Sequence, residues 1–312
     1  MKKGCEYSPS CLPKDSDQTH PPLLVSQGKN SQGHTFYDIS KNESIKRDIP
    51  EFCNKHVSAT SYGWLTLIDY RKKPLDCCLF NPESNEMIQL PSIKPEREKY
   101  QCFLSKPPTH PDCYVLLFVS CRNFLHFCRL GDEKFIKRQI KLHTLTSFKE
   151  KIYARMSESG NFVEIDFVDQ HLLLKEMVND SGQILHIPWP SPSNAPWHAH
   201  DLVESCGELL LVHMIGYHHS AQVAYFRIFR INTVEREWEE LSSIGDRTIF
   251  FSLFGSMSLS CTNRSYLKKN SIYYSWIDRN LWIYDIEDRS KTLIKSTPSR
   301  IGTTDSKSWI ML

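Results

Sequence analysis

Two histidine pairs are the residues of this chain best suited by type and spacing to bind a ligand. His198 and His200 are separated by one residue, and His218 and His219 are adjacent. Two such pairs could hold a divalent metal through imidazole nitrogens, but no Cys or carboxylate stands beside them at a recurrent ligand spacing. We therefore predict no metal or cofactor and expect these histidines in exposed loops around Trp197.

A second candidate is the charged stretch Gly245–Arg247. The guanidinium of Arg247 could bind a carboxylate or phosphate through two parallel hydrogen bonds. We favour the alternative of a tight turn in which Arg247 pairs internally. Asp285 and Asp288 lie in a predicted turn, where carboxylates more often hold the turn than act as acid and base. Glycine-rich phosphate loops and a Gly-x-Ser-x-Gly nucleophile motif are absent, so we predict that the chain is not an enzyme.

The composition restricts the class of partner. The chain has 312 residues, with 38 basic and 36 acidic side chains and a net charge of +2. This balance argues against a nucleic-acid partner or a polybasic membrane surface. The 11 cysteines form no Cys-x-x-Cys pair and are expected to be small core side chains in a reducing compartment. The longest apolar run, Tyr114–Val119, is too short to span a bilayer. We expect a soluble protein of the cytoplasm, the nucleus or both.

The elements that must position these side chains recur along the chain. Phe226–Arg247 reads as a strand, a polar turn, a second strand carrying Trp238, and a charged exit. Units of strand, strand, polar turn and strand begin near Leu23, Gly63, Tyr114, Lys151, Gly207 and Ser271. One such sheet cannot bury both faces alone, so neighbouring units must cover one another. The fold is predicted to be all-β, a single β-propeller of six degenerate kelch-like blades. A pair of β-sandwiches is the alternative.

Segments outside the units give further expectations. Residues 1–20 are polar without periodicity and are predicted to be a disordered N-terminal lead, followed by a propeller domain over residues 21–312. The run Pro188–Trp197 is rich in Pro, Ser and Trp and should be a loop. Thr248–Cys261 could supply further strands, and Ser147–Arg155 could form one helical turn.

The tryptophans divide by context. Trp64, Trp238, Trp276 and Trp282 fall in or beside predicted strands and are expected in the core, because aromatic rings bury large areas between sheets. By contrast, the loop residues Trp189 and Trp197 are candidates for surface contact with a partner.

Two blocks of sequence resemble a large plant family. Residues 63–91, GWLTLIDYRKKPLDCCLFNPESNEMIQLP, resemble its Gly-Trp-Leu, Leu-x-Asn-Pro and Ile-x-Leu-Pro opening. Within residues 201–251, DLVESCGELLLVHMIG and FRIFRINTVEREWEELSSIGDRTIFF resemble its later block, and NSIYYSW and WIYDIED resemble its last blade. The resemblance is to the F-box-associated, KIB-type β-propeller family and runs from about Pro21 to the end of the chain.

The resemblance implies a non-enzymatic propeller related to the substrate receptors of SCF ubiquitin ligases, in which an F-box docks a Skp-type adaptor. Leu12-Pro13 is followed by KDSDQTH and not by an amphipathic helix, so this sequence has no recognisable F-box. A Skp-type adaptor is expected only if an F-box exists upstream. The alternative is a propeller enzyme or a small-molecule binder that uses the central channel.

We therefore expect a protein-interaction propeller that contacts an unidentified protein partner through the loops 188–200 and 216–222. The residues predicted to make these contacts are Trp189, Trp197, His198, His200, His218 and His219.

Overall fold

A computed structural model describes most of the chain. The described residues are 23–27, 34–46, 48–96, 99–119, 122–188, 197–217, 222–252, 254–296 and 306–312. The expected N-terminal lead over residues 1–20 lies outside them. The described residues contain 25 strands and no α-helix, with two short 3-10 turns, η2 (Pro50–Phe52) and η3 (Ser61–Gly63). No helix within the described ranges is long and apolar enough to cross a bilayer.

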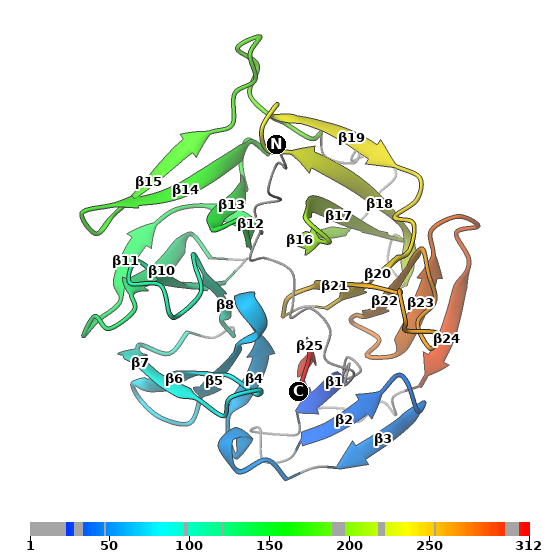
Figure 1. The fold of residues 1–312 in the computed structure, drawn as a ribbon, viewed down its shortest axis with the longest axis horizontal. Helices are drawn as coiled ribbons and strands as arrows, with labels where there is room; N and C mark the ends of the chain where they lie inside the picture. Colours follow the sequence, from blue (N-terminus) through cyan, green and yellow to red (C-terminus); the bar gives the residue numbers. More distant parts are fainter. Residues whose placement is uncertain are drawn as a thin grey trace, which may run out of the picture.

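The strands form six hydrogen-bonded sheets arranged around one axis, as in a single β-propeller (Figure 1). The first sheet contains β25 (Ser306–Ile310), β1 (Leu23–Gln27), β2 (His34–Asp38) and β3 (Glu43–Lys46). The second contains β4 (His56–Ala59), β5 (Leu65–Asp69), β6 (Leu75–Phe80) and β7 (Met87–Ile93). The third contains β8 (Gln101–Leu104), β9 (Tyr114–Phe118), β10 (Phe124–Arg129) and β11 (Ile136–Gln139). In each sheet the strand named first lies nearest the propeller axis and the strand named last is outermost (Figure 1).

The remaining sheets follow in the same order around the ring. The fourth contains β12 (Leu142–Phe148), β13 (Lys151–Met156), β14 (Phe162–Val168) and β15 (His171–Glu176). The fifth contains β16 (His198–Ser205), β17 (Glu208–Gly216), β18 (Val223–Asn232) and β19 (Glu237–Leu241). The sixth contains β21 (Met257–Ser260), β20 (Arg247–Phe251), β22 (Ser271–Ser275), β23 (Leu281–Asp285) and β24 (Lys291–Lys295).

The sixth sheet departs from the regular pattern that the repeats predicted. Five sheets have four strands, whereas the sixth has five, and its β20 pairs with β22 in parallel. The predicted sixth unit covers β22, β23 and β24. The other two strands of this sheet, β20 and β21, come from Thr248–Cys261 and the adjoining Arg247, the segment expected to supply further strands. The connection Thr262–Asn270 lies between β21 and β22 and lets the chain return in the same direction as β20. Described strands therefore make five regular blades and one irregular sheet, so the expectation of six repeated blades was wrong.

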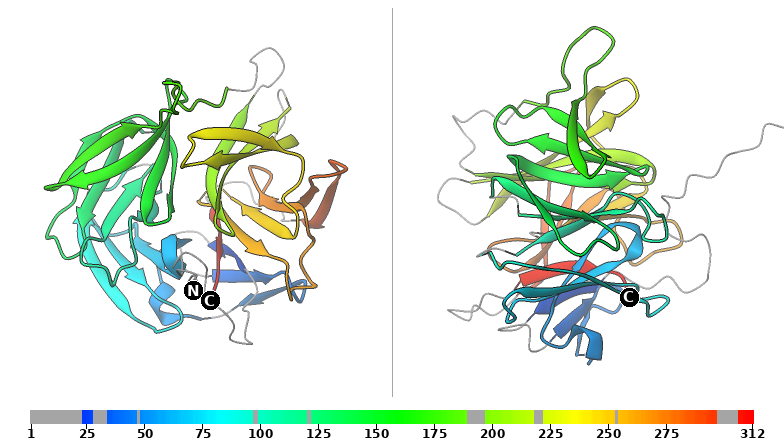
Figure 2. Two further views of the ribbon diagram at one scale, coloured as in Figure 1. Left: turned by 45° about the horizontal axis from the view of Figure 1, so that its top comes forward. Right: turned by 90° about the vertical axis from the view of Figure 1, so that its left-hand side faces the viewer.

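The first sheet joins the two ends of the chain. β25 pairs antiparallel with β1, and Trp309 lies opposite Leu24. Figure 2 shows this C-terminal strand, in red, beside the blue N-terminal strands. Because β25 lies at the C-terminal end of the sequence and β1 near the N-terminal end, the hydrogen bonds between them close the ring of sheets.

Apolar side chains fill the gaps between neighbouring sheets. Six buried clusters lie one in each gap, including the gap between the sixth and first sheets, where Trp309 packs with Tyr37 and Phe250. This explains the runs of consecutive apolar residues in β5 and β17. A strand covered on both faces buries successive residues, not alternate ones. Of the described cysteines, Cys53 and Cys206 are exposed and the other six are buried.

Three local expectations were wrong or incomplete. Ser147–Arg155 forms no helical turn, because it contains the end of β12 and most of β13. Trp238 is not in the core. It lies on β19, the outermost strand of the fifth sheet, with 39% of its surface exposed, and its Nε1 donates to the His186 carbonyl at 3.0 Å. Trp64 is buried as expected, whereas Trp276 and Trp282 are half-buried against the fifth- and sixth-sheet cluster.

Candidate partner-binding site

Trp197 lies directly before β16, at one end of the propeller. Its indole stacks on that of Trp276, with centroids 6.0 Å apart and 13° between the planes. Its carbonyl accepts a hydrogen bond from the Gly216 amide at 3.0 Å. Both indoles are half-buried and pack on the apolar cluster between the fifth and sixth sheets. Trp197 is thus partly exposed at the surface, as expected, and its buried part packs against the apolar cluster between the fifth and sixth sheets.

Exposed apolar side chains continue this surface. Tyr217 follows β17 and is 50% exposed, and Ile277 follows Trp276 and is 59% exposed. The ammonium of Lys291 lies 5.4 Å from the centroid of the Tyr217 ring. We call this surface the aromatic patch, and it consists of Trp197, Tyr217, Trp276 and Ile277. Large amphipathic rings held by packing lose little conformational freedom on binding, which makes them effective interface anchors.

The predicted histidines divide between surface and interior. His198 is exposed beside the patch, as expected, but His200 is buried on β16 and was wrongly placed in an exposed loop. The His200 ring stacks on His143 of β12, with centroids 3.6 Å apart, and lies 5.2 Å from His213 of β17. No group of metal-ligating side chains is found among the described residues. Trp189, His218 and His219 lie outside the described ranges.

A buried guanidinium anchors this histidine group. Arg155 of β13 is fully buried, and its Nε donates to the Gly160 carbonyl at 3.2 Å. A second nitrogen donates to the Ile187 carbonyl, and a third lies 3.3 Å from His213 Nε2. These contacts hold the turn after β13 and the segment that ends at residue 188 against the fifth sheet. Burial lowers the pKa of Arg155 to about 10.

The imidazoles are uncharged at neutral pH. Burial, reinforced by the Arg155 charge, lowers the pKa of His143 to about 4 and that of His213 to about 3. Burial also lowers the pKa of His200 well below its usual value, with the neighbouring His143 and Arg155 adding to the effect. Neutral rings can stack closely, whereas imidazolium ions would repel one another and Arg155. The group therefore acts as a polar contact between the fourth and fifth sheets, on the face of the fifth sheet opposite to the Trp197–Trp276 stack.

The charged stretch after β19 is structural, as favoured from the sequence. Arg247 donates to the Ile244 carbonyl at 2.7 Å and to the Ser205 carbonyl at 3.1 Å, and it pairs with Glu208 at 2.7 Å. All of these partners are internal to the fold. Asp285 likewise serves a turn, since its Oδ1 accepts the Glu287 amide at 2.9 Å.

Gly216 should be intolerant of any side chain. A Cβ at this position would overlap the indole of Trp197. Gly216→Ala is therefore expected to displace Trp197 from Trp276, to change the tryptophan fluorescence and to weaken partner binding. As a control, Gly182→Ala should leave the patch intact, because no atom lies within 4 Å of a Cβ there and the strain of a side chain at its φ of +76° falls on the turn Asn179–Gln183, away from the patch. Unchanged fluorescence in Gly216→Ala would contradict the placement of the indole.

Part of this site could be located from the sequence. The loops that carry Trp197, His198 and Tyr217 were identified, because Pro, Trp and His are conspicuous there. His143, His213 and Arg155, which lie in strands on two sheets, were missed. Only packing between the sheets brings them to His200, and no local pattern in the sequence signals that contact.

The fold and this site define a single all-β propeller with an aromatic patch at one end. Residues 36–297 match the family model described as the KIB1-4 beta-propeller, and the chain belongs to this family.

Two relatives from Arabidopsis thaliana carry F-box names. The chain is 28% identical over 97 residues to F-box protein At3g25750, covering 29% of this chain and 27% of that protein. It is 22% identical over 318 residues to F-box protein At4g17565, covering 89% of this chain and 79% of that protein. The first match thus spans about a quarter of the length of that relative.

A solved structure of TolB from Acinetobacter baumannii is similar with a TM-score of 0.46 and 10% identity, covering 94% of this chain and 67% of that chain. A similarity at this level carries no argument about function.

Proposed function

We propose that this propeller recognises a protein partner and presents it to a ubiquitin ligase, as a non-enzymatic substrate receptor. The observation that carries the proposal is the family match over nearly the whole propeller, together with relatives named as F-box proteins. The aromatic patch supports it, because it offers the exposed Tyr217 and Ile277 side chains beside two stacked, half-buried indoles. No step of this function requires a cofactor.

Recognition would use the patch in a defined way. Tyr217 and Ile277 are exposed and would enter a pocket or groove of the partner, while the stacked Trp197 and Trp276 hold their backbone positions. His198 at the edge would add a hydrogen bond. Binding energy in such interfaces concentrates in a few anchoring side chains surrounded by contacts that exclude water.

The connection to the ligase would be made outside the described propeller. A Skp-type adaptor binds an F-box, so we propose this contact for the protein only where an F-box precedes the propeller. The propeller itself, over residues 21–312, would contribute the partner specificity.

Paired variants test the proposal. The double variant Tyr217→Ala/Ile277→Ser removes the exposed anchors, and Val234→Ala/Leu173→Ser removes similarly exposed apolar groups elsewhere, at 84% and 42% exposure. Proteins that co-purify with the wild type and the control should be lost from the patch variant. The same proteins should have longer half-lives in cells depleted of this chain.

Two results would overturn it. One is that the patch variant retains every partner of the wild type at equal yield. The other is that the partners lost from the patch variant have the same half-life in cells with and without this chain. That result would support partner binding by the patch and contradict a role in ubiquitin ligation.

A further inference from the structure

A cavity lies between the third and fourth sheets, at the end of the propeller opposite to the aromatic patch. Its volume is about 950 Å³, and it is lined by residues from Ser105–Tyr114, Arg129, Glu150–Ile152, Glu164–Gln170 and Lys175. Strand β13 runs from Lys151 at this cavity to Arg155 beside the histidine group. The length of one strand therefore separates the cavity from the histidine group.

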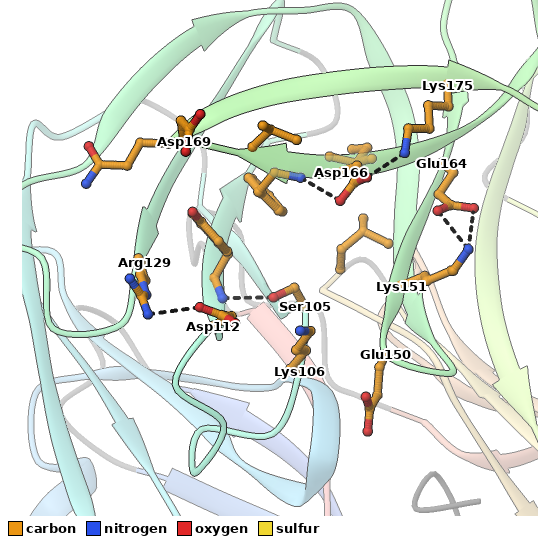
Figure 3. A pocket seen from close by; sticks show the side chains of 16 residues that line it. Ser105, Lys106, Asp112, Arg129, Glu150, Lys151, Glu164, Asp166, Asp169 and Lys175 are labelled. Carbon is orange, nitrogen blue, oxygen red and sulfur yellow. Dashed lines mark hydrogen bonds and ion pairs between the residues drawn. The ribbon is translucent and has the colours of Figure 1, made fainter.

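Ion pairs between partly exposed side chains line the walls of this cavity (Figure 3). Arg129 pairs with Asp112 at 2.9 Å. On the fourth sheet, Lys151 pairs with Glu164 at 2.9 Å and Lys175 pairs with Asp166 at 2.5 Å. Six charged side chains are thus already neutralised and oriented by neighbours.

An aromatic pair joins the two walls. The rings of Tyr114 on β9 and Phe167 on β14 stack with centroids 3.9 Å apart and 5° between their planes. Their contact spans the boundary between the third and fourth sheets. Such a surface binds the aliphatic stem of a long side chain, and the ring faces attract a cation.

Three charged side chains of the lining are not used by the fold. Glu150, Asp169 and Lys106 form no ion pair or side-chain hydrogen bond with any described residue. Glu150 and Asp169 occupy two tight turns, before β13 and before β15, with backbone φ of 59° and 48°. Left-handed turn positions favour Gly, Asn and Asp, so Asp169 suits its turn, whereas Glu150 is an uncommon residue at its position.

We propose that this cavity binds an extended peptide segment that carries two basic side chains, from a protein partner. The carboxylates of Glu150 and Asp169 would receive the two cations, and the Tyr114–Phe167 pair would contact a Lys or Arg stem. Lys106 would hold a backbone carbonyl or a carboxylate of the same segment. The cavity volume falls in the range of sites that enclose most of a small ligand or peptide. Binding here does not depend on the proposed function of the aromatic patch.

Two labelled peptides test the assignment on the full chain. Fluorescence anisotropy would compare a fluorescein-labelled octapeptide of alternating Lys and Ala with the same peptide carrying Glu in place of Lys. The basic peptide should bind, and the acidic one should not. Affinity should fall as salt rises, because the recognised charges are exposed. Equal binding of the two peptides would overturn the proposal.

Charge-matched variants locate the binding. Glu150→Gln/Asp169→Asn should weaken binding of the basic peptide about tenfold, as expected for the loss of two exposed charge contacts. Glu43→Gln/Glu83→Gln removes the same charge from exposed positions on other sheets and should bind as the wild type does. Equal affinity in the two double variants would overturn the site. If spermidine at the same concentration as the basic peptide displaced that peptide, the assignment of a peptide as the ligand of this cavity would be overturned.

Discussion

Replacing Trp309 by alanine is expected to lower the free energy of unfolding by about 3–5 kcal/mol. The side chain is only 2% exposed, and its Nε1 donates to the Phe251 carbonyl at 3.3 Å. Its ring packs on Phe250 with centroids 4.8 Å apart. Because Trp309 lies on β25, its loss opens a cavity where the ring closes, and urea denaturation would measure the effect.

Trp238→Ala provides the matched comparison. That ring is 39% exposed on an outer strand and contacts Phe229 edge-on with centroids 5.5 Å apart. Its loss should cost about 1–2 kcal/mol, mainly one hydrogen bond and part of one ring contact. A larger loss of stability for Trp238→Ala than for Trp309→Ala would contradict the assignment of Trp309 to the ring closure.

Acidification from pH 7 to pH 5 is expected to lower the free energy of unfolding by about 4 kcal/mol or more. His143 and His213 have folded pKa values of about 4 and 3, below the ordinary value of 6.5, and the folded pKa of His200 is also well below it. Between pH 6.5 and pH 4 the unfolded chain therefore binds more protons. Stability is present above pH 6.5 and is lost as the pH falls through this window.

Two acids, Asp201 and Glu204, oppose this trend. Burial raises the pKa of Asp201 from 3.8 to about 6, so its protonation favours the folded state as the pH falls. Burial also raises the pKa of Glu204, but three imidazoles act in the other direction and His126, whose pKa burial lowers to about 4, adds to them. Destabilisation should therefore dominate in denaturant titrations at pH 5, 6 and 7.

His143→Gln identifies the source of the pH dependence. This variant should reduce the slope of stability against pH by up to about 1.4 kcal/mol per unit. Stability that stays constant or rises on acidification would contradict a neutral histidine group in the fold.

Much of the sheet architecture could be predicted from the sequence. The two middle strands of each regular sheet carry neighbouring apolar residues, and the outermost strand follows a polar turn such as Asn81–Asn85, so the positions of these three strands were clear. The innermost strands β4, β8, β12 and β16 were not assigned. They are short or mix polar with apolar residues, as in His198–Ser205, and only neighbouring strands make them recognisable.

The site was less predictable because its parts come from different sheets. A propeller buries residues against the next sheet, and the partner of His200 lies far earlier in the chain at His143, a separation that no local pattern reveals. The burial of Trp309 and the exposure of Trp238 could not be predicted from the sequence for a similar reason. Both are Trp residues in strands, and only the position of the strand within its sheet distinguishes them.

Site-specific photocrosslinking tests most directly that the aromatic patch is the partner-binding surface. A benzoylphenylalanine would replace Tyr217 in one variant and Val234 in the other. These positions follow β17 and β18, at opposite ends of the fifth sheet, and are 50% and 84% exposed. We predict a discrete crosslinked protein from position 217 and none from position 234. The same crosslinked protein from both positions, or one from position 234 alone, would contradict the account.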